Sequence, residues 1–523
     1  MSARLLKAIT ALLCFAACVA VQARDTVALG AGGRLELDKK ALSLVDGAGK
    51  LRATLPMRAS QLDVRAAGGT GLAVVLDSAT QHAQLFRFDV ARGSLVALTP
   101  LPLQSFGVES LCLFRDRQQV DQLFIAGKDG QAEQWLLDGD RARLVRKLSM
   151  PPDAGQCKVD DAAHTLYIEE EKVGTWAYEA DSEATPTRSL LKRGARVARD
   201  EGSAMVVVQP RAQTEPVARL GDVADDPAIW VNRAAPANSR VLGTNKKQGL
   251  MVYDMQGRQT QFLASGRLNN VDLRQGVTVD GKAYDLAVAS QRDDNTVVLY
   301  GIDSAGSVAE LARFATGLPQ VYGICLFQPR AGGLEVIVND KSGTFRQFGI
   351  GRDGKRWTAT LGRQFKVGSQ PEGCVADDRN ERLFLGEEKV GVWTMAAGSA
   401  GGTAMHKVLA TGKHLRADVE GLAIYHGARG AYLVVSSQGD SSYVVLDAVA
   451  PYKVRGRFRV GFNLGADIDG TSETDGLEVT SADLGGAFGQ GMLVIQDGYK
   501  RMPDGPQNFK YVSWEDVARA LHL

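Results

Sequence analysis

Six acidic or tyrosine residues recur at a nearly constant spacing along the second half of the chain, each beside a short apolar stretch. The gaps between them are 46, 50, 50, 48 and 55 residues, and the residues are Asp226, Asp272, Tyr322, Glu372, Glu420 and Asp475. A period of this length is typical of radial repeats, in which each unit is one small sheet and equivalent positions meet around one axis. Clustered carboxylates repel one another unless a hard cation neutralises them, so the spacing predicts a centre for several calcium ions.

The composition favours an all-β protein with many turns. The chain contains 58 glycines among short runs rich in Val, Leu, Ile, Tyr and Phe, and the clearest helical pattern begins only at Ser513. Its 61 basic and 60 acidic residues nearly cancel, so no overall field points to nucleic acid. About 500 mature residues exceed one ordinary domain, and we expect two.

Residues 1–23 have the organisation of a signal peptide. A short basic region precedes an apolar run over residues 8–21, and cleavage is expected after Ala23. The apolar run is shorter than the roughly 20 residues of a membrane-spanning helix, and no later run approaches that length. We expect an exported protein, periplasmic or extracellular, without a membrane partner. A lipoprotein anchored through Cys18 is the alternative.

The first half of the chain repeats part of the second. LCLFRDRQQVDQLFIAGKDG from Leu111 is similar to ICLFQPRAGGLEVIVNDKSG from Ile324, and IEEEKVGTW is similar to LGEEKVGVW. The first half therefore duplicates roughly residues 240–398 and has no counterpart of residues 399–523. We expect residues 24–205 to form an incomplete propeller-like domain and residues 206–523 to form a second domain that holds the complete ring.

Four cysteines lie beyond the signal peptide and follow the duplication. Cys112 and Cys157 belong to the first copy, and Cys325 and Cys374 belong to the second. Matching positions imply matching bonds, so in an oxidising compartment we expect one disulfide within each copy, joining neighbouring units. Free buried thiols are the alternative. The Cys and His spacings do not suit zinc.

Acidic and basic side chains alternate along the second half. The acidic set is Asp222, Asp225, Asp226, Glu372, Glu387, Glu388, Asp418, Glu420, Asp467, Asp469 and Asp475, and the basic set is Lys246, Lys247, Arg292 and Lys341. Taken singly, each is more often a solvated charge. Their recurrence at the repeat period indicates a site where carboxylates hold calcium ions and the cations hold phosphate groups.

Ten ordered motifs from about Thr214 to the C-terminus resemble those of the β-propeller phytases. They are DVADDPAIWV, GTNKKQGLMVYD, GRLNNVDLR, VYGICLF, SQPEGCVADD, EEKVGVW, ADVEGLAIY, SSQGDSSY, DGTSETDGLEV and QNFKYVSWEDVA. Members of that family are calcium-dependent enzymes that release phosphate from phytate. The resemblance implies a six-bladed β-propeller with an acidic, calcium-filled channel mouth and a 3-phytase-type phosphoric monoester hydrolase activity.

The resemblance also implies roles for individual residues. The active-site calcium ligands would be Asp225, Tyr322, Glu372, Glu388, Asp418, Glu420 and Asp475. The phosphate-binding residues would be Lys246, Lys247, Arg292 and Lys341. Further calcium sites would use Asp226, Asp469 and Gln438. The chain departs from its bacterial relatives at Pro319-Gln320 and at Ser342, where those relatives carry acidic residues, so one calcium site is expected to be weaker.

The expected reaction is hydrolysis without a covalent enzyme intermediate. A water that bridges two calcium ions would attack phosphorus, while the cations neutralise the phosphate and a second phosphate pocket favours phytate. We expect the protein to act as a monomer. One alternative is a non-enzymatic ring that binds proteins or sugars and lacks converging carboxylates. Another is a calcium-dependent phosphodiesterase or lactonase, which the basic residues disfavour.

The role of the first copy is left open by the sequence. It has Ser78, Glu109 and Gly155 where the second copy has Arg292, Tyr322 and Glu372, and these losses predict that it is inactive. It would be an accessory element that captures phosphate or substrate, or that steadies the catalytic domain. A structural relic is the alternative.

Overall fold

The structure, a computed structural model, describes residues 25–29, 32–197 and 205–523. It is an all-β molecule, which confirms the expected fold class, and it ends in the short helix α1 (Trp514–Leu521). Three single 3-10 turns are η2 (Pro236–Asn238), η3 (Gln438–Asp440) and η4 (Gly486–Phe488). The predicted signal peptide and Cys18 lie outside the described residues. In the described part of the chain, no helix has both the length and the apolarity needed to cross a membrane.

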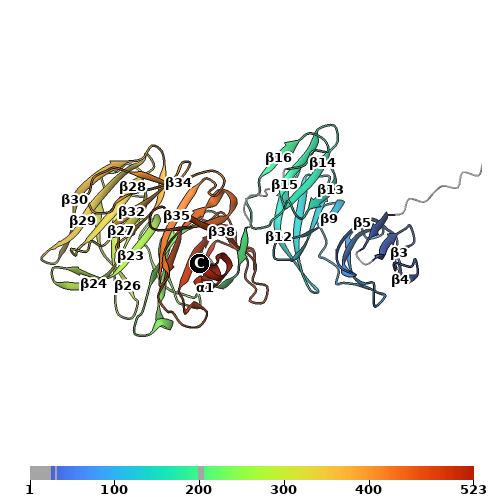
Figure 1. The fold of residues 1–523 in the computed structure, drawn as a ribbon, viewed down its shortest axis with the longest axis horizontal. Helices are drawn as coiled ribbons and strands as arrows, with labels where there is room; N and C mark the ends of the chain where they lie inside the picture. Colours follow the sequence, from blue (N-terminus) through green and yellow to red (C-terminus); the bar gives the residue numbers. More distant parts are fainter. Residues whose placement is uncertain (1–24, 30–31, 198–204) are drawn as a thin grey trace, which may run out of the picture.

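Residues 206–523 form six sheets, which we call the ring (Figure 1). Four of the sheets follow chain order, and their strands are β19 (Ala224–Trp230), β20 (Arg240–Asn245), β21 (Gly249–Tyr253) and β22 (Gln259–Leu263); β23 (Leu268–Val279), β24 (Lys282–Gln291), β25 (Thr296–Ile302) and β26 (Val308–Ala315); β27 (Val321–Phe327), β28 (Leu334–Asp340), β29 (Thr344–Asp353) and β30 (Arg356–Lys366); β31 (Pro371–Asp377), β32 (Arg382–Glu387), β33 (Gly391–Ala396) and β34 (His406–Ala410).

The last two sheets each receive an outermost strand from the start of the ring segment. The strands are β35 (Val419–Gly427), β36 (Gly430–Ser437), β37 (Ser442–Asp447) and β38 (Val454–Val460) with β17 (Val206–Val208), and β39 (Leu477–Thr480), β40 (Met492–Asp497) and β41 (Asn508–Ser513) with β18 (Pro210–Gln213). β17 runs parallel to β38, and β18 runs antiparallel to β41. The two ends of the ring segment are therefore joined by backbone hydrogen bonds.

The first strands of the six sheets, β19, β23, β27, β31, β35 and β39, line the axis of the ring. Each contacts the next, and β39 contacts β19, so the circle is closed. An apolar cluster fills the space between each pair of neighbouring sheets. Because first strands are covered on both faces, every residue of β19 and β31 is buried, whereas the outer strand β22 is mostly exposed.

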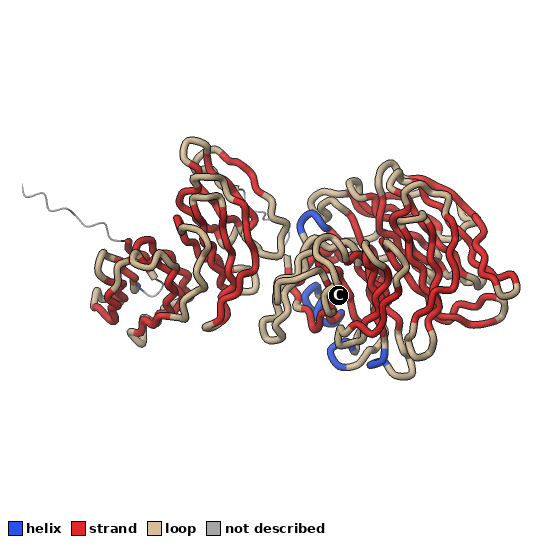
Figure 2. Tube along the Cα trace, turned by 180° about the vertical axis from the view of Figure 1, so that it is seen from behind, coloured by secondary structure: helices blue, strands red, loops and turns tan. Residues whose placement is uncertain are grey.

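Residues 25–191 form four further sheets, which we call the arc (Figures 1 and 2). Their strands are β1 (Asp25–Ala28), β2 (Arg34–Leu37), β3 (Ala41–Val45) and β4 (Leu51–Pro56); β5 (Ala59–Ala67), β6 (Thr70–Asp77), β7 (Ala83–Asp89) and β8 (Ser94–Ala97); β9 (Val108–Arg115), β10 (Asp121–Gly127), β11 (Gln131–Asp138) and β12 (Arg141–Ser149); β13 (Ala154–Asp160), β14 (Thr165–Glu170), β15 (Gly174–Glu179) and β16 (Arg188–Leu191). The first strands β1, β5, β9 and β13 contact one another in that order.

Equivalent arginines make the same contacts in the arc and in the ring. Arg65 bonds to Asp63 and to the carbonyl of Leu113 on the neighbouring sheet. Arg274, its counterpart, bonds to Asp272 (2.8 Å) and to the carbonyl of Leu326 (2.8 Å). Each arginine also pairs with an aspartate one sheet further on, Asp161 or Asp378. The duplication seen in the sequence is thus repeated in side-chain contacts that join three successive sheets.

Both expected disulfides are present. Cys112 on β9 is bonded to Cys157 on β13, and Cys325 on β27 is bonded to Cys374 on β31. Each bond joins the first strands of two neighbouring sheets, which are also in direct contact. The disulfides therefore hold sheets together where no backbone ladder does.

Loss of the ring disulfide should destabilise the ring. We expect the double variant Cys325→Ala, Cys374→Ala to lose about 2–4 kcal/mol of unfolding free energy, because the bond restricts the unfolded chain across a separation of 49 residues. Denaturant unfolding followed by fluorescence measures this. The matched control, Cys112→Ala with Cys157→Ala, should destabilise the arc instead. An unchanged ring transition in the first variant would contradict this account.

Candidate functional site

A hollow of about 520 Å³ lies at one end of the ring axis, and we call it the acidic pocket. Its acidic lining residues are Asp222, Glu372, Glu388, Asp418, Glu420, Glu473, Asp475 and Asp504. Lys246, Tyr322 and Gln438 also line it. These side chains come from all but one of the six sheets or from the turns beside them, so the closed ring brings together residues that are far apart in the sequence.

Bulges at the start of the first strands direct these side chains toward the axis. In five of the six sheets the ladder shifts register after the first residue of the first strand. A bulged residue leaves the ladder and its side chain is re-aimed. The second residues of these strands are Asp225, Asn269, Tyr322, Glu372 and Glu420. In the sixth sheet, Asp475 lies just before β39.

Three glutamates form the centre of the acidic pocket. Glu372, Glu388 and Glu420 each offer a carboxylate oxygen, and these oxygens lie within 4.8 Å of one another. All three residues are buried. Burial raises the pKa of Glu388 to about 7 and raises the pKa of Glu420 well above its usual range, with further increases from neighbouring carboxylates. Oε2 of Glu420 has no hydrogen-bond partner.

Lys246 joins the second acidic group of the pocket. Its Nζ lies 2.6 Å from Asp475 Oδ2, 2.7 Å from Asp222 Oδ1 and 3.4 Å from Asp225 Oδ2. Asp225 is fully buried, and neither of its carboxylate oxygens has a hydrogen-bond donor. Burial raises the pKa of Asp475 to about 6 and that of Asp225 well above its usual range, although Lys246 acts in the opposite direction. One ammonium group is therefore the positive partner of three carboxylates.

Two further cations stand over Tyr322. Lys341 Nζ lies 4.3 Å from the centre of the Tyr322 ring, and the guanidinium carbon of Arg292 lies 5.8 Å from it. Arg292 also donates to Asn269 Oδ1 (3.1 Å), and Asn269 donates to Glu372 Oε1 (2.7 Å). Burial and the charge of Glu372 raise the pKa of Tyr322, so its hydroxyl stays protonated. Positive side chains thus flank the glutamate centre.

Gln370, Gln438 and Asp418 also line the acidic pocket. Gln438 donates to Asp475 Oδ1 (2.6 Å), and Gln370 donates to Glu388 Oε1 (2.6 Å). Asp418 forms an ion pair with Lys389, whose side chain is mostly exposed. The two amides therefore hold the carboxylates in place without neutralising them.

Three of the residues to which the resemblance assigned a role lie away from this centre. Asp226 accepts the backbone N–H of Val271 (3.0 Å) and so ties β19 to the next sheet. Asp469 is fully buried against Lys510 (2.8 Å). Lys247 is exposed and contributes its backbone N–H to a turn.

Asn269 is the residue of the centre that the sequence analysis did not identify. The search for recurring acids selected Asp272 as the marker of its unit, but Asp272 accepts the backbone N–H of Leu326 (2.8 Å) and so ties two sheets together. Asn269, three residues earlier, takes the axial position. Its place two residues before an apolar stretch, as in Glu420 and Glu372, is the signal that could have revealed it.

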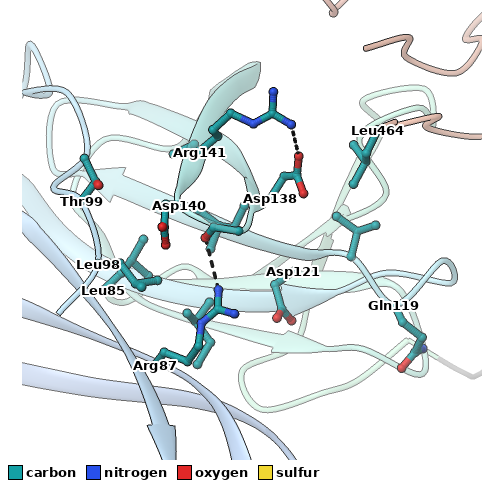
Figure 3. A pocket seen from close by; sticks show the side chains of 15 residues that line it. Leu85, Arg87, Leu98, Thr99, Gln119, Asp121, Asp138, Asp140, Arg141 and Leu464 are labelled. Atoms are coloured by element: carbon teal, nitrogen blue, oxygen red, sulfur yellow. Dashed lines mark hydrogen bonds and ion pairs between the residues drawn. The ribbon is translucent and has the colours of Figure 1, made fainter. Parts of the chain in front are cut away.

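A second hollow, of about 230 Å³, lies in the arc with Leu464 of the ring at its edge (Figure 3). Two of its three aspartates are paired with arginines: Asp138 with Arg141 (2.7 Å) and Asp121 with Arg115 (2.8 Å). This hollow has no converging group of acids like the one in the acidic pocket. The acidic pocket is therefore the stronger candidate for a cation site.

Comparison with known proteins identifies the family of the chain. A model of the phytase family matches residues 187–522, which include all six sheets of the ring. A 3-phytase of Bacillus subtilis (strain 168) is 40% identical over 330 residues, which cover 60% of this chain and 85% of that protein. The matched segment, the all-β ring and the acidic pocket coincide, and the chain belongs to the phytase family.

Proposed function

We propose that this protein releases phosphate from phytate in the acidic pocket, with calcium ions held by the carboxylates there. The observation that carries the proposal is the meeting of Asp225, Glu372, Glu420 and Asp475 at one end of the ring axis, beside Lys246. A buried group of acids with too few cations is costly by itself and becomes favourable when a multiply charged cation is bound. A substrate with several phosphates complements both the bound calcium ions and the surrounding lysine and arginine side chains.

The pocket residues fit calcium. Its donors are carboxylate and amide oxygens, which suit a hard cation, and buried oxygens of Asp225 and Glu420 have no hydrogen-bond donor. Glu372, Glu388 and Glu420 would hold one ion, and Asp225 and Asp475 would contribute to another. When bound, calcium supplies positive charge to phosphate oxygens and lowers the pKa of a coordinated water.

The side chains around the centre would bind and orient the substrate. Lys341 and Arg292 stand together over Tyr322, close enough for both to contact one phosphate group. Lys246 would serve a phosphate once calcium takes over the charge of its carboxylate partners. Asn269 positions Glu372 and Arg292 relative to each other, because it bonds to both.

The alternatives fit the site less well. A ring that only binds proteins or sugars was expected to lack converging carboxylates, and this ring has them. A lactone or a phosphodiester would leave most of the cations without a partner. We also propose that the protein is exported as a monomer, that residues 24–205 are non-catalytic, and that residues 206–523 form the catalytic domain. The two disulfides support export.

The activity should depend on calcium and on Glu388. Phosphate release from phytate is expected in calcium and not in excess chelator. We expect Glu388→Gln to lower kcat/KM at least about 100-fold, because it removes a charge from the cation centre. Glu171→Gln is the matched control, since Glu171 is the counterpart of Glu388 in the arc. Equal activity of both variants would exclude the acidic pocket as the active site.

Calcium should also change how stability depends on pH. Glu388 and Asp475 have folded pKa values of about 7 and about 6, above those of an unfolded chain, near 4. The folded state then holds protons more tightly, so without calcium their contribution to stability falls as pH rises from about 4.5 to 7. Calcium favours the ionised form and should reverse this loss.

Thermal unfolding between pH 4.5 and 8, in chelator and in calcium, measures this dependence. The increase in Tm caused by calcium should grow with pH. In chelator, Glu388→Gln should lose less stability across this range than the natural protein does. The same pH profile for both proteins would show that Glu388 does not have a raised pKa.

A further inference from the structure

The junction between the arc and the ring contains a buried acidic loop, residues 181–184, which we call the docking loop. It follows β15 at the side of the arc that meets the ring (Figures 1 and 2). Glu183 accepts the hydroxyl of Ser472 (2.7 Å) and the N–H of Gly470 (3.3 Å), and its Oε2 lies 3.3 Å from Nε of Arg501. Glu183 and Arg501 are both almost fully buried at this contact.

These contacts reach one side of the acidic pocket. Residues 498–501 and 504–507 line that side, and we call the whole segment 498–507 the pocket wall. Arg501 belongs to the wall, and its backbone N–H donates to Asp469. Ser472 is joined to the start of the wall, because its carbonyl accepts the N–H of Gly498 (2.8 Å). A single carboxylate of the arc therefore holds the wall at two points.

An apolar contact supports the same segment. Met502, the next residue of the wall, is 1% exposed and packs with Phe462 of the ring and with Leu136 and Val145 of the arc. The carbonyl of Val145 also lies 3.5 Å from Nη1 of Arg501. The pocket wall is thus packed against the arc on the side opposite to the pocket.

A second acid of the docking loop connects to another pocket residue. Asp181 forms an ion pair with Arg459 (2.8 Å), and Arg459 donates to the carbonyl of Asp440 (2.8 Å). Asp440 ends the turn η3, which begins with Gln438 of the acidic pocket. Glu183 therefore contacts the pocket wall directly, and Asp181 is connected to η3 through Arg459.

The docking loop differs from its counterpart in the second copy. Both loops are held by an arginine on the preceding sheet that bonds to their backbone carbonyls, Arg146 in the arc and Arg363 in the ring. At the positions of Asp181 and Glu183, however, the second copy has Gly398 and Ala400. The loop backbone is shared, whereas the acidic side chains that contact the ring occur in the arc alone.

We propose that Glu183 of the arc is a positioning residue for substrate binding at the acidic pocket. By bonding to Ser472 and Arg501, Glu183 keeps the pocket wall in one arrangement. The arc thereby fixes one side of the acidic pocket, although no described residue of the arc lines the pocket. This proposal rests on the proposed function, because it takes phytate as the substrate that the pocket wall helps to bind. If the wall were ordered in only a tenth to a third of molecules, apparent substrate affinity would fall about 3- to 10-fold.

Steady-state kinetics on the full-length protein tests this. We expect Glu183→Ala to raise KM for phytate about 3- to 10-fold and to change kcat less than about twofold, because the wall contributes to binding and not to the carboxylate centre. Glu183→Gln keeps an acceptor for Ser472 and Gly470 but loses the charge opposite Arg501. Its KM should therefore lie between that of the natural protein and that of Glu183→Ala. An unchanged KM in Glu183→Ala would overturn the proposal.

The matched control is Arg143→Ala. Arg143 forms an ion pair with Asp467 of the ring, so this variant also removes a contact between arc and ring, but one that does not involve the pocket wall. Its KM should match that of the natural protein, and an equal rise in both variants would overturn the assignment to Glu183.

Hydrogen exchange provides a readout that does not need activity. Amides of residues 498–505 should exchange faster in Glu183→Ala and at the natural rate in Arg143→Ala. Unchanged exchange in both variants would overturn the proposal even if the protein proved to act on another substrate. Faster exchange in a protein with no phytase activity would instead support the positioning role and exclude the proposed function.

Discussion

Repulsion between buried carboxylates at the ring axis is the constraint on which the arrangement of this molecule depends. Glu372 and Glu420 approach each other from neighbouring sheets, and Asp225 and Asp475 share one lysine. Left to themselves such groups would separate or take up protons, and their raised pKa values express that cost. A divalent cation that binds between the carboxylates removes their repulsion, and the relief of this repulsion increases the affinity for the cation.

The ring supplies the rigidity that this repulsion requires. Asp225, Glu372 and Glu420 extend from bulges in buried first strands, and an apolar cluster fixes every sheet against its neighbours. Asp226 and Asp272 use their carboxylates differently, as acceptors for backbone groups of the next sheet. In the arc, Gly155 replaces the central glutamate and the acids do not converge. The arc therefore does not have to hold clustered acids, and one of its loops instead places Glu183 against Ser472 and Arg501 of the ring.

The sequence was most informative where a physical requirement repeats. The period of about 50 residues located the first strands, because every sheet of a closed ring must begin alike, and the duplication paired Cys112 with Cys157 and Cys325 with Cys374. The period could not distinguish Asp225 from Asp226, or Asn269 from Asp272, because the bulges that decide which side chain faces the axis have no composition signal of their own. The duplication identifies Glu109 on β9 and Gly155 on β13 as counterparts of Tyr322 and Glu372, but it identifies no such residue in the sheet β1–β4. The contact of Glu183 with Arg501 was also beyond reach, since it joins loops more than 300 residues apart.

Anomalous X-ray scattering from crystals grown in calcium tests the central claim most directly. The account predicts calcium peaks in the acidic pocket, one of them contacting Glu372, Glu388 and Glu420, with Lys246 drawn away from at least one of its carboxylates. An acidic pocket without a calcium peak at saturating calcium, with Lys246 still bonded to Asp475 and Asp222, would contradict it.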